Sequence, residues 1–165
     1  MKLLKPAELA YWNEYVSMLP ESERPHAPSV HAACAGSPAI TDELLALYLE
    51  GTKTAGSSVL EDFVSCGDPV PKVGDYWIFL DSASRPRSIL RTERVVLSKF
   101  FEVPIEIAVA EGEGDLSLEY WRRVHTEIYQ PHLKEWGVSS LEEATVITEY
   151  FAIVHRSPSP NDADF

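Results

Sequence analysis

The chain has 165 residues, of which 45% are hydrophobic, and its 26 acidic residues outnumber its 14 basic ones to give a net charge of −12. This length and apolar content suit a single domain with one core. The acidic balance argues against tight, non-specific binding of duplex DNA, which depends on many lysine and arginine contacts to phosphates. A compact site for one nucleotide or a short single strand needs only a local positive patch and is not excluded.

The N-terminus and the cysteines narrow the class of protein further. The opening MKLLKPAELAYW has Lys5 and Pro6 where a signal peptide needs an unbroken apolar run. No stretch approaches the roughly 20 apolar residues that span a bilayer. Cys34 and Cys66 are isolated and lack CxxC spacing, which argues against structural zinc. We therefore predict a cytoplasmic protein with no membrane partner.

The first part of the chain predicts one helix followed by a long loop. Residues 6–19 carry aromatic and aliphatic side chains at helical spacing. Residues 20–38 contain four prolines and predict a loop without secondary structure of its own. We accordingly separate an N-terminal helix and Pro-rich loop (1–39) from a domain at 40–156. The polar, Pro-bearing end SPSPNDADF predicts a disordered tail at 157–165.

A lone lysine then stands where a helix gives way to a strand. Residues 41–50 (TDELLALYLE) predict a short amphipathic helix, Gly51 fits the left-handed residue that ends helices, and residues 52–59 are rich in strand and turn residues. An amine at such a junction can be held in one orientation. Lys53 is therefore a candidate for binding phosphate, for stabilising an oxyanion or, if burial lowers its pKa, for acting as a base. The competing interpretation is a solvated surface lysine.

The rest of the chain mixes strands with helices. Helices are predicted at 104–111 and 118–135, and strands, with a hairpin connection at 82–86, at 75–81, 88–97 and 145–155. This mixture predicts an α+β fold.

Four blocks of this sequence, in this order and spacing, resemble the ASCH domain family. They are GTKTAGSS, KVGDYWIFLD, EGEGDLSLEYWR and the closing VITEYFAIV. The pattern EGEGD-x-S-x-x-YWR in the third block is the most specific part of the resemblance. The resemblance covers roughly residues 40–155. It implies a PUA-like β-barrel flanked by helices, RNA or a nucleoside or nucleotide as partner, and Lys53 as the main site residue.

An acidic comb follows, in which glycines separate Glu111, Glu113 and Asp115. One carboxylate could act as a general base, or two could hold a divalent ion such as Mn²⁺ or Mg²⁺. An EF-hand is excluded because Leu116 stands where its glycine must be. Asp115 could instead cap the following helix. The resemblance favours Glu113, because short members of the family, which hydrolyse the amide of N4-acetylcytidine, have a glutamate that aligns here.

Those short members also carry a threonine three residues after the lysine, and in this chain that position is Gly56. Ser57 or Ser58 could substitute if the backbone bulges at the glycine. In a regular strand, however, Lys53 and Ser57 would lie about 13 Å apart, so a hydrogen-bonded pair requires a bend.

Aromatic and basic side chains complete the candidate site. Tyr76 and Trp77 point to opposite faces of their strand, so at most one can line a cleft. We take Trp77 as the candidate for base stacking, beside Gly56 and Ser58 as further substrate contacts. Arg91 and Arg122 are candidates for holding a phosphate.

The sequence predicts no metal site in the histidines. His125 and His132 are seven residues apart on one predicted helical face, and no third ligand is evident. No cofactor is predicted beyond the divalent ion that the acidic comb could hold.

Three functions follow from these residues and the resemblance. Longer members of the family, whose layout this chain follows more closely, imply a hydrolase that cleaves single-stranded RNA, with Lys53 stabilising charge and Glu113 as general base. The first alternative is an amidohydrolase of N4-acetylcytidine-like nucleosides with Ser57 as nucleophile. The second is a non-catalytic module that binds RNA or a nucleotide.

Overall fold

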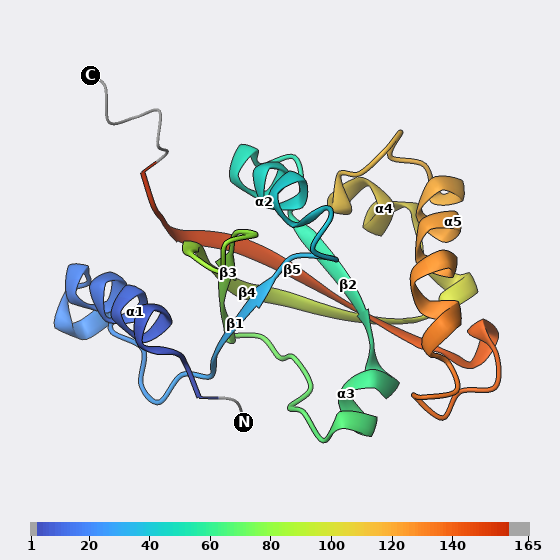
Figure 1. The fold of residues 1–165 in the computed structure, drawn as a ribbon, viewed down its shortest axis with the longest axis horizontal. Coiled ribbons are helices and arrows are strands. Elements are labelled where there is room, and N and C mark those ends of the chain that lie inside the picture. The colour runs from blue at the N-terminus through green and yellow to red at the C-terminus, as the bar shows by residue number, and fades with distance from the viewer. Residues whose placement is uncertain (1–2, 159–165) are drawn as a thin grey trace.

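The computed structural model describes residues 3–158. Within them the chain forms one mixed five-stranded sheet, curled into a half-barrel and surrounded by five α-helices (Figure 1). The prediction of an α+β fold is confirmed. In sheet order, the strands are β1 (Val30–Cys34), β3 (Tyr76–Leu80), β4 (Pro86–Lys99), β5 (Thr145–Arg156) and β2 (Ala55–Val59). The β1–β3 pair is parallel, and the other three pairs are antiparallel.

Two helices cover opposite faces of β3. Successive residues of a strand point to opposite sides, so Ile78 and Phe79 belong to different cores. Helix α1 (Pro6–Met18) packs an aromatic cluster that includes Trp12 against the Ile78 face. Helix α2 (Thr41–Glu50) packs Tyr48 against Phe79 on the other face. The α2 side carries the candidate site.

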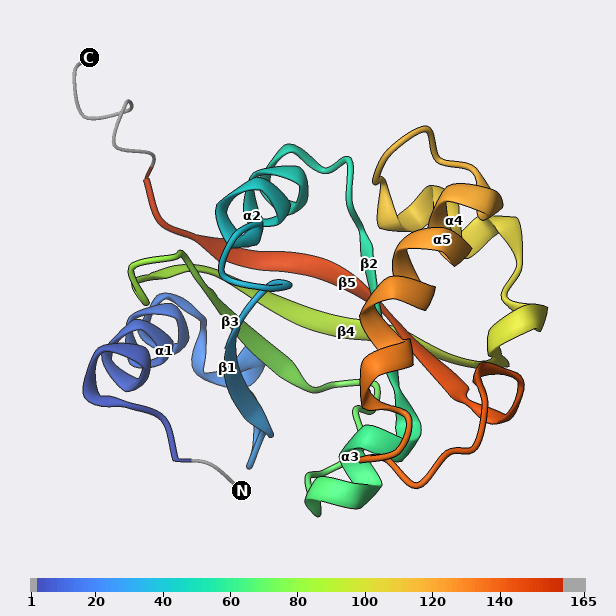
Figure 2. The same cartoon turned by 45° about the vertical axis from the view of Figure 1, so that its right-hand side comes forward.

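A third core joins the far end of the sheet to the remaining helices. Helix α3 (Leu60–Cys66) follows β2 directly, while α4 (Ile105–Glu111) and α5 (Leu118–Tyr129) come between β4 and β5 in the chain. Phe100, Ile107 and Trp121 pack there against Val59 and Val146 of the sheet. Figure 2 shows α4 and α5 beside the ends of β2, β4 and β5, where α5 flanks the sheet.

The structure corrects the sequence prediction in three places. Residues 20–38 are not a loop without secondary structure, because they contain β1. Short helix α3, which the sequence did not predict, continues from β2. The long helix predicted at 118–135 ends at Tyr129 and continues as a 3₁₀ turn, Gln130–His132. Pro131 explains the end, since proline has no N–H to continue the α-helical ladder.

The described C-terminal end of the chain packs back onto helix α1. The predicted tail at 157–165 begins in the described part, where the Ser157 hydroxyl donates to Tyr11 Oη at 3.0 Å. Its remainder, from residue 159, lies outside the described residues. No helix within residues 3–158 has the length and apolar character needed to cross a bilayer.

Candidate functional site

Lys53 is buried, with only 5% of its surface exposed. Its backbone N–H donates to the carbonyl of Leu47 at 3.0 Å, and the N–H of Thr54 donates to the carbonyl of Ala110 at 2.8 Å. These bonds fix the junction between α2 and β2 to the C-terminal ends of α2 and α4. The interpretation of Lys53 as a solvated surface lysine is therefore wrong.

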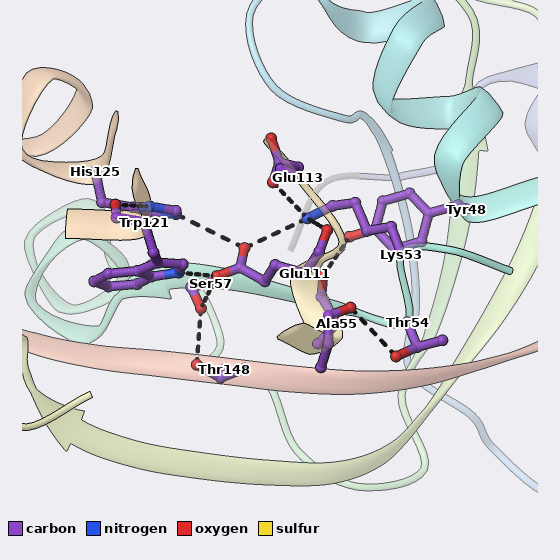
Figure 3. A network of polar contacts seen from close by, with 11 residues as sticks. Tyr48, Lys53, Thr54, Ala55, Ser57, Glu111, Glu113, Trp121, His125 and Thr148 are labelled. Carbon is purple, nitrogen blue, oxygen red and sulfur yellow. Dashed lines mark hydrogen bonds and ion pairs between the residues drawn. The ribbon is translucent and has the colours of Figure 1, made fainter. Parts of the chain in front are cut away.

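The Lys53 amine lies between two carboxylates (Figure 3). Nζ is 2.9 Å from Glu113 Oε2 and 3.4 Å from Glu111 Oε1, and it also donates to the Glu111 carbonyl at 3.3 Å. It stands 5.2 Å from the centre of the Tyr48 ring, which adds a cation–π contact. Folding thus brings the predicted pair, Lys53 and Glu113, into direct contact.

The glycines of the acidic comb allow this contact. Gly112 ends α4 with a φ of +66°, and a Cβ there would lie 2.2 Å from the carbonyl oxygen of Thr52. Only glycine permits the two backbones to approach so closely. Asp115 is placed differently from the two glutamates, because its carboxylate accepts from the N–H of Ser117, the N-cap residue of α5. The interpretation of Asp115 as the cap of the following helix is therefore wrong, because Ser117 caps α5 by accepting from the N–H of Tyr120 and Asp115 holds only the turn before it.

Glu111 is the centre of the polar network, a role that the sequence did not reveal. Its side chain is 3% exposed. Oε2 accepts hydrogen bonds from the Ser57 hydroxyl at 3.0 Å and from Trp121 Nε1, while His125 Nε2 lies 3.7 Å from Oε1 (Figure 3). Four side chains from β2, α5 and the Lys53 junction therefore converge on one carboxylate.

This environment keeps Glu111 ionised. Burial by itself would raise the pKa of the carboxyl, but the contacts with His125, Lys53 and Trp121 outweigh it and lower the pKa from 4.5 to about 2. A carboxylate with so low a pKa is a weak base near neutral pH. Glu111 is thus suited to positioning its neighbours rather than to accepting a proton.

The His125 ring has a defined orientation. Its Nδ1 atom is 2.8 Å from the carbonyl oxygen of Trp121, and because a carbonyl can only accept, Nδ1 carries the proton of that bond. The ring stacks on the Trp121 indole with centroids 4.0 Å apart and an interplanar angle of 14°. Nε2 consequently points toward Glu111.

Ser57 makes no hydrogen bond to Lys53, so the Lys53–Ser57 pair that the sequence left open does not form. Its hydroxyl lies between Glu111 Oε2 and Thr148 Oγ1, 2.8 Å from the latter. At Gly56, a Cβ would lie 2.7 Å from Tyr48 Oη. The volume that a threonine side chain would need at this position is therefore occupied by the tyrosine hydroxyl.

This crowding gives a first prediction. Gly56→Thr should lower the free energy of unfolding by about 1–3 kcal/mol, because overpacking forces neighbouring groups to shift. Combining it with Tyr48→Phe, which removes the obstructing hydroxyl, should recover part of the loss. Thermal or urea unfolding of the two single variants and the double variant checks this coupling. Strictly additive effects would contradict it.

A cavity of about 370 Å³ opens beside this network. Its volume is near the lower end of the roughly 300–1,000 Å³ typical of small-molecule sites. The wall includes residues 33–37, which form the end of β1 and the turn after it, and the aromatic residues Tyr48, Phe79 and Phe151. Its polar lining includes Lys53, Ser57, Ser58, Trp77, Glu111, Glu113, His125 and Glu149.

The predicted substrate contacts divide into two groups. Gly56, Ser58 and Trp77 line the cavity, as expected, while Tyr76 lies in the α1 core. The two arginines do not reach it. Arg91 pairs with Glu93 at 2.6 Å, and Arg122 donates to the carbonyl of Phe101 at 3.0 Å. The aromatic part of the predicted site is thus assembled at the cavity, and the arginines lie elsewhere.

Glu149, in β5, is a cavity residue that the sequence analysis missed. Its Oε1 atom accepts from Trp77 Nε1 and from Thr92 Oγ1, both at 2.9 Å. Burial raises the pKa of Glu149 from 4.5 to about 7, against the lowering effect of these two hydrogen bonds, and the charge of Asp75 adds to the rise. A single acid within the apolar run VITEYFAIV was the available signal.

The raised pKa of Glu149 predicts how stability depends on pH. Between pH 4.5 and 7 the folded state holds a proton that the unfolded state has released, so stability falls as pH rises through this window, by about 3 kcal/mol in total. Glu149→Gln cannot ionise and should lack this loss. Urea unfolding at pH 5 and pH 8 checks it. The free energy of unfolding of the variant, relative to that of wild type, should be higher at pH 8 than at pH 5, and equal pH dependence of the two proteins would contradict the prediction.

No group of three or more His, Cys, Asp or Glu side chains within residues 3–158 is arranged to hold a metal ion. The acidic comb contributes two carboxylates to the Lys53 amine, and its third member turns to the cap of α5.

The curled sheet and its helices define a PUA-like α+β half-barrel. A model of the ASCH domain family matches residues 31–155, and the chain belongs to this family, which is generally RNA-associated. The fold is similar to an ASCH domain from Lactobacillus crispatus JV V101, with a TM-score of 0.84 and 22% identity over 92% of this chain and 96% of that one. It is also similar to a protein from Enterococcus faecalis V583, with a TM-score of 0.73 and 26% identity over 88% of this chain and 86% of that one. No curated protein sequence matches this chain significantly.

Proposed function

We propose that this ASCH domain is a hydrolase that removes an acyl group from the exocyclic nitrogen of a nucleobase, as a nucleoside or within RNA. The observation that carries the proposal is the Lys53–Glu113 pair, with Nζ and Oε2 2.9 Å apart, in the wall of an aromatic cavity of about 370 Å³. Such a cavity suits one base, since the rings of its wall offer contact to a flat heterocycle.

The charges of the cavity favour an amide over a phosphodiester. Lys53 is its one lysine or arginine among the described residues, and Glu111 and Glu113 already neutralise that charge. Two carboxylates would repel the negative charge of a phosphate placed at the amine, whereas a neutral amide has no charge to be repelled. Because Arg91 and Arg122 lie elsewhere, they supply no compensating charge at the cavity. These placements favour the amidohydrolase over the ribonuclease.

The proposed reaction uses water as the nucleophile. Glu113 accepts a proton from the water as its oxygen bonds to the acyl carbon, and the Lys53 ammonium stabilises the oxyanion that forms. Collapse of this intermediate breaks the carbon–nitrogen bond. The proton held by Glu113 passes to the leaving nitrogen, and the products are a carboxylic acid and the free amino base.

Ser57 has a positioning role in this proposal. The acceptor next to its hydroxyl is Glu111, whose pKa of about 2 makes it a weak base for activating a nucleophile. Ser57→Ala should therefore keep most of the activity, in contrast to the expectation for a serine nucleophile.

Turnover of N4-acetylcytidine, followed as cytidine release by chromatography, tests the proposal. Wild type should produce cytidine, and Glu113→Gln should reduce the rate roughly 100- to 10,000-fold, the usual contribution of a general base. Glu119→Gln, on the same stretch of chain but outside the cavity lining, is the matched control and should behave as wild type. Cleavage of single-stranded RNA, with or without Mn²⁺, by an enzyme that leaves N4-acetylcytidine intact would replace this proposal with the ribonuclease. RNA binding without turnover of either substrate would favour the non-catalytic module.

A further inference from the structure

The polar wall of the cavity contains a third acid, Glu149, that the proposed chemistry does not use. The residue is 6% exposed and lines the cavity. Both of its donors, Trp77 and Thr92, bond to the same oxygen, Oε1. Within residues 3–158, Oε2 receives no hydrogen bond.

A carboxylate that is held firmly through one oxygen and left open at the other has the form of a recognition group. The two donors on Oε1 fix the plane and direction of the carboxyl group, so the cost of ordering it is met before a ligand binds. Within the described residues, Oε2 is not one of the side-chain atoms that are fully buried without a partner, so a ligand in the cavity can reach it and supply the hydrogen bond that it lacks. An ionised carboxylate can only accept, so the matching ligand group is an N–H or O–H donor.

We propose that Glu149 determines the specificity of the cavity by accepting a hydrogen bond, through Oε2, from the exocyclic amino group of a nucleobase of the cytosine type. This inference rests on the proposed function and names the edge of the base that faces β5. A base with an oxo group in the same place would set its oxygen against the carboxylate. The amino base is thereby selected over the oxo base.

The cavity charge supports an amino edge. Glu111 and Glu113 together carry one more negative charge than Lys53 neutralises, so the electrostatic field in the cavity favours groups with partial positive charge. Glu149 has a pKa of about 7, and a hydrogen bond from a ligand N–H stabilises its ionised form. Amino-base binding and release of this proton are consequently coupled.

The coupling gives the direction of the pH dependence. Affinity for cytidine should rise roughly tenfold between pH 6 and pH 8, as the ionised fraction of Glu149 increases. The groups facing Glu149 that could also titrate are Asp75, which raises its pKa, and the buried Tyr48, whose own pKa is raised well above 10. His31, 4.8 Å from the Trp77 ring, has a pKa lowered by burial. Across the cavity lie the titratable side chains of Lys53, Glu111, Glu113 and His125.

Calorimetric binding of cytidine and uridine at pH 8 tests the proposal. Wild type should bind cytidine roughly 10- to 100-fold more tightly than uridine, the usual worth of a hydrogen bond to a charged group. Glu149→Gln has the same shape and can still accept from Trp77 and Thr92, but it turns an amide NH₂ toward the ligand. It should therefore prefer uridine, and its affinities should not change between pH 6 and pH 8.

Glu113→Gln separates this inference from the proposed function. That variant should lose turnover and keep the preference for cytidine, because it leaves Glu149, the proposed acceptor for the amino group, unchanged. Failure of wild type to hydrolyse N4-acetylcytidine, with the cytidine preference intact, would overturn the reaction and leave Glu149 as the recognition group. An unchanged cytidine-to-uridine ratio in Glu149→Gln, or no binding of either nucleoside by wild type, would overturn the inference about Glu149.

Discussion

Lys53→Met is expected to abolish hydrolysis and to lower the free energy of unfolding by about 3–5 kcal/mol. Methionine fills a similar volume but leaves Glu111 and Glu113 without the cation that both contact in the wild type. Removing one partner of a buried ion pair is costly because the remaining charge stays desolvated. The activity loss has a separate cause, since the variant has no ammonium to stabilise the oxyanion.

Urea unfolding and N4-acetylcytidine turnover measure the two effects independently, with turnover assayed at a temperature at which the variant is folded. Lys72→Met is the matched control. Lys72 also pairs with a carboxylate, Asp75, at 2.9 Å, but its side chain is 64% exposed. Asp75 is itself buried, but it keeps the hydrogen bond from the Lys72 backbone N–H, so the control should lose less stability than Lys53→Met and should keep its turnover. Similar, small stability losses in the two variants would mean that Lys53 is not a buried structural cation.

The sequence predicts the Lys53–Glu113 pair because both residues stand in local patterns that carry information. A helix end at Gly51 positions the lysine, and the resemblance to the ASCH family picks one glutamate out of the acidic comb. The structure confirms the helix end, with Gly51 in the left-handed conformation, and places the two side chains in contact. Their catalytic roles stay proposals.

What the sequence does not predict depends on contacts between distant segments. Glu111 is central because β2 and α5 meet at its carboxylate, and no local pattern encodes that convergence. Strand β1 forms by pairing with β3, although prolines surround it in the chain, since strand formation depends strongly on tertiary context. The prediction that Arg91 lies at the site is wrong for a related reason. Strand parity gives the face on which a side chain lies but not its partner, which for Arg91 is Glu93.

The network around Glu111 should also make the fold sensitive to acid. The pKa of Glu111 is about 2 in the folded protein and near 4.5 when unfolded, so its contribution to stability, about 3 kcal/mol, is complete above pH 4.5. As pH falls from 4.5 toward 2, the unfolded state takes up a proton first and this contribution is lost. Roughly 2 kcal/mol of it should be gone at pH 3.

Glu111→Gln isolates this effect, because glutamine resembles the protonated acid. The variant should be much less stable than wild type at pH 7, and the gap should narrow as pH falls toward 3. Urea unfolding at several pH values measures it, with Asp115→Asn as the control, since Asp115 is an exposed acid whose pKa is also lowered, by hydrogen bonds from Ser117. A gap between wild type and Glu111→Gln that stays constant with pH would show that folding does not lower the pKa of Glu111. A gap that narrows would tie the acid sensitivity of the whole domain to the same carboxylate that positions Lys53, Ser57 and His125.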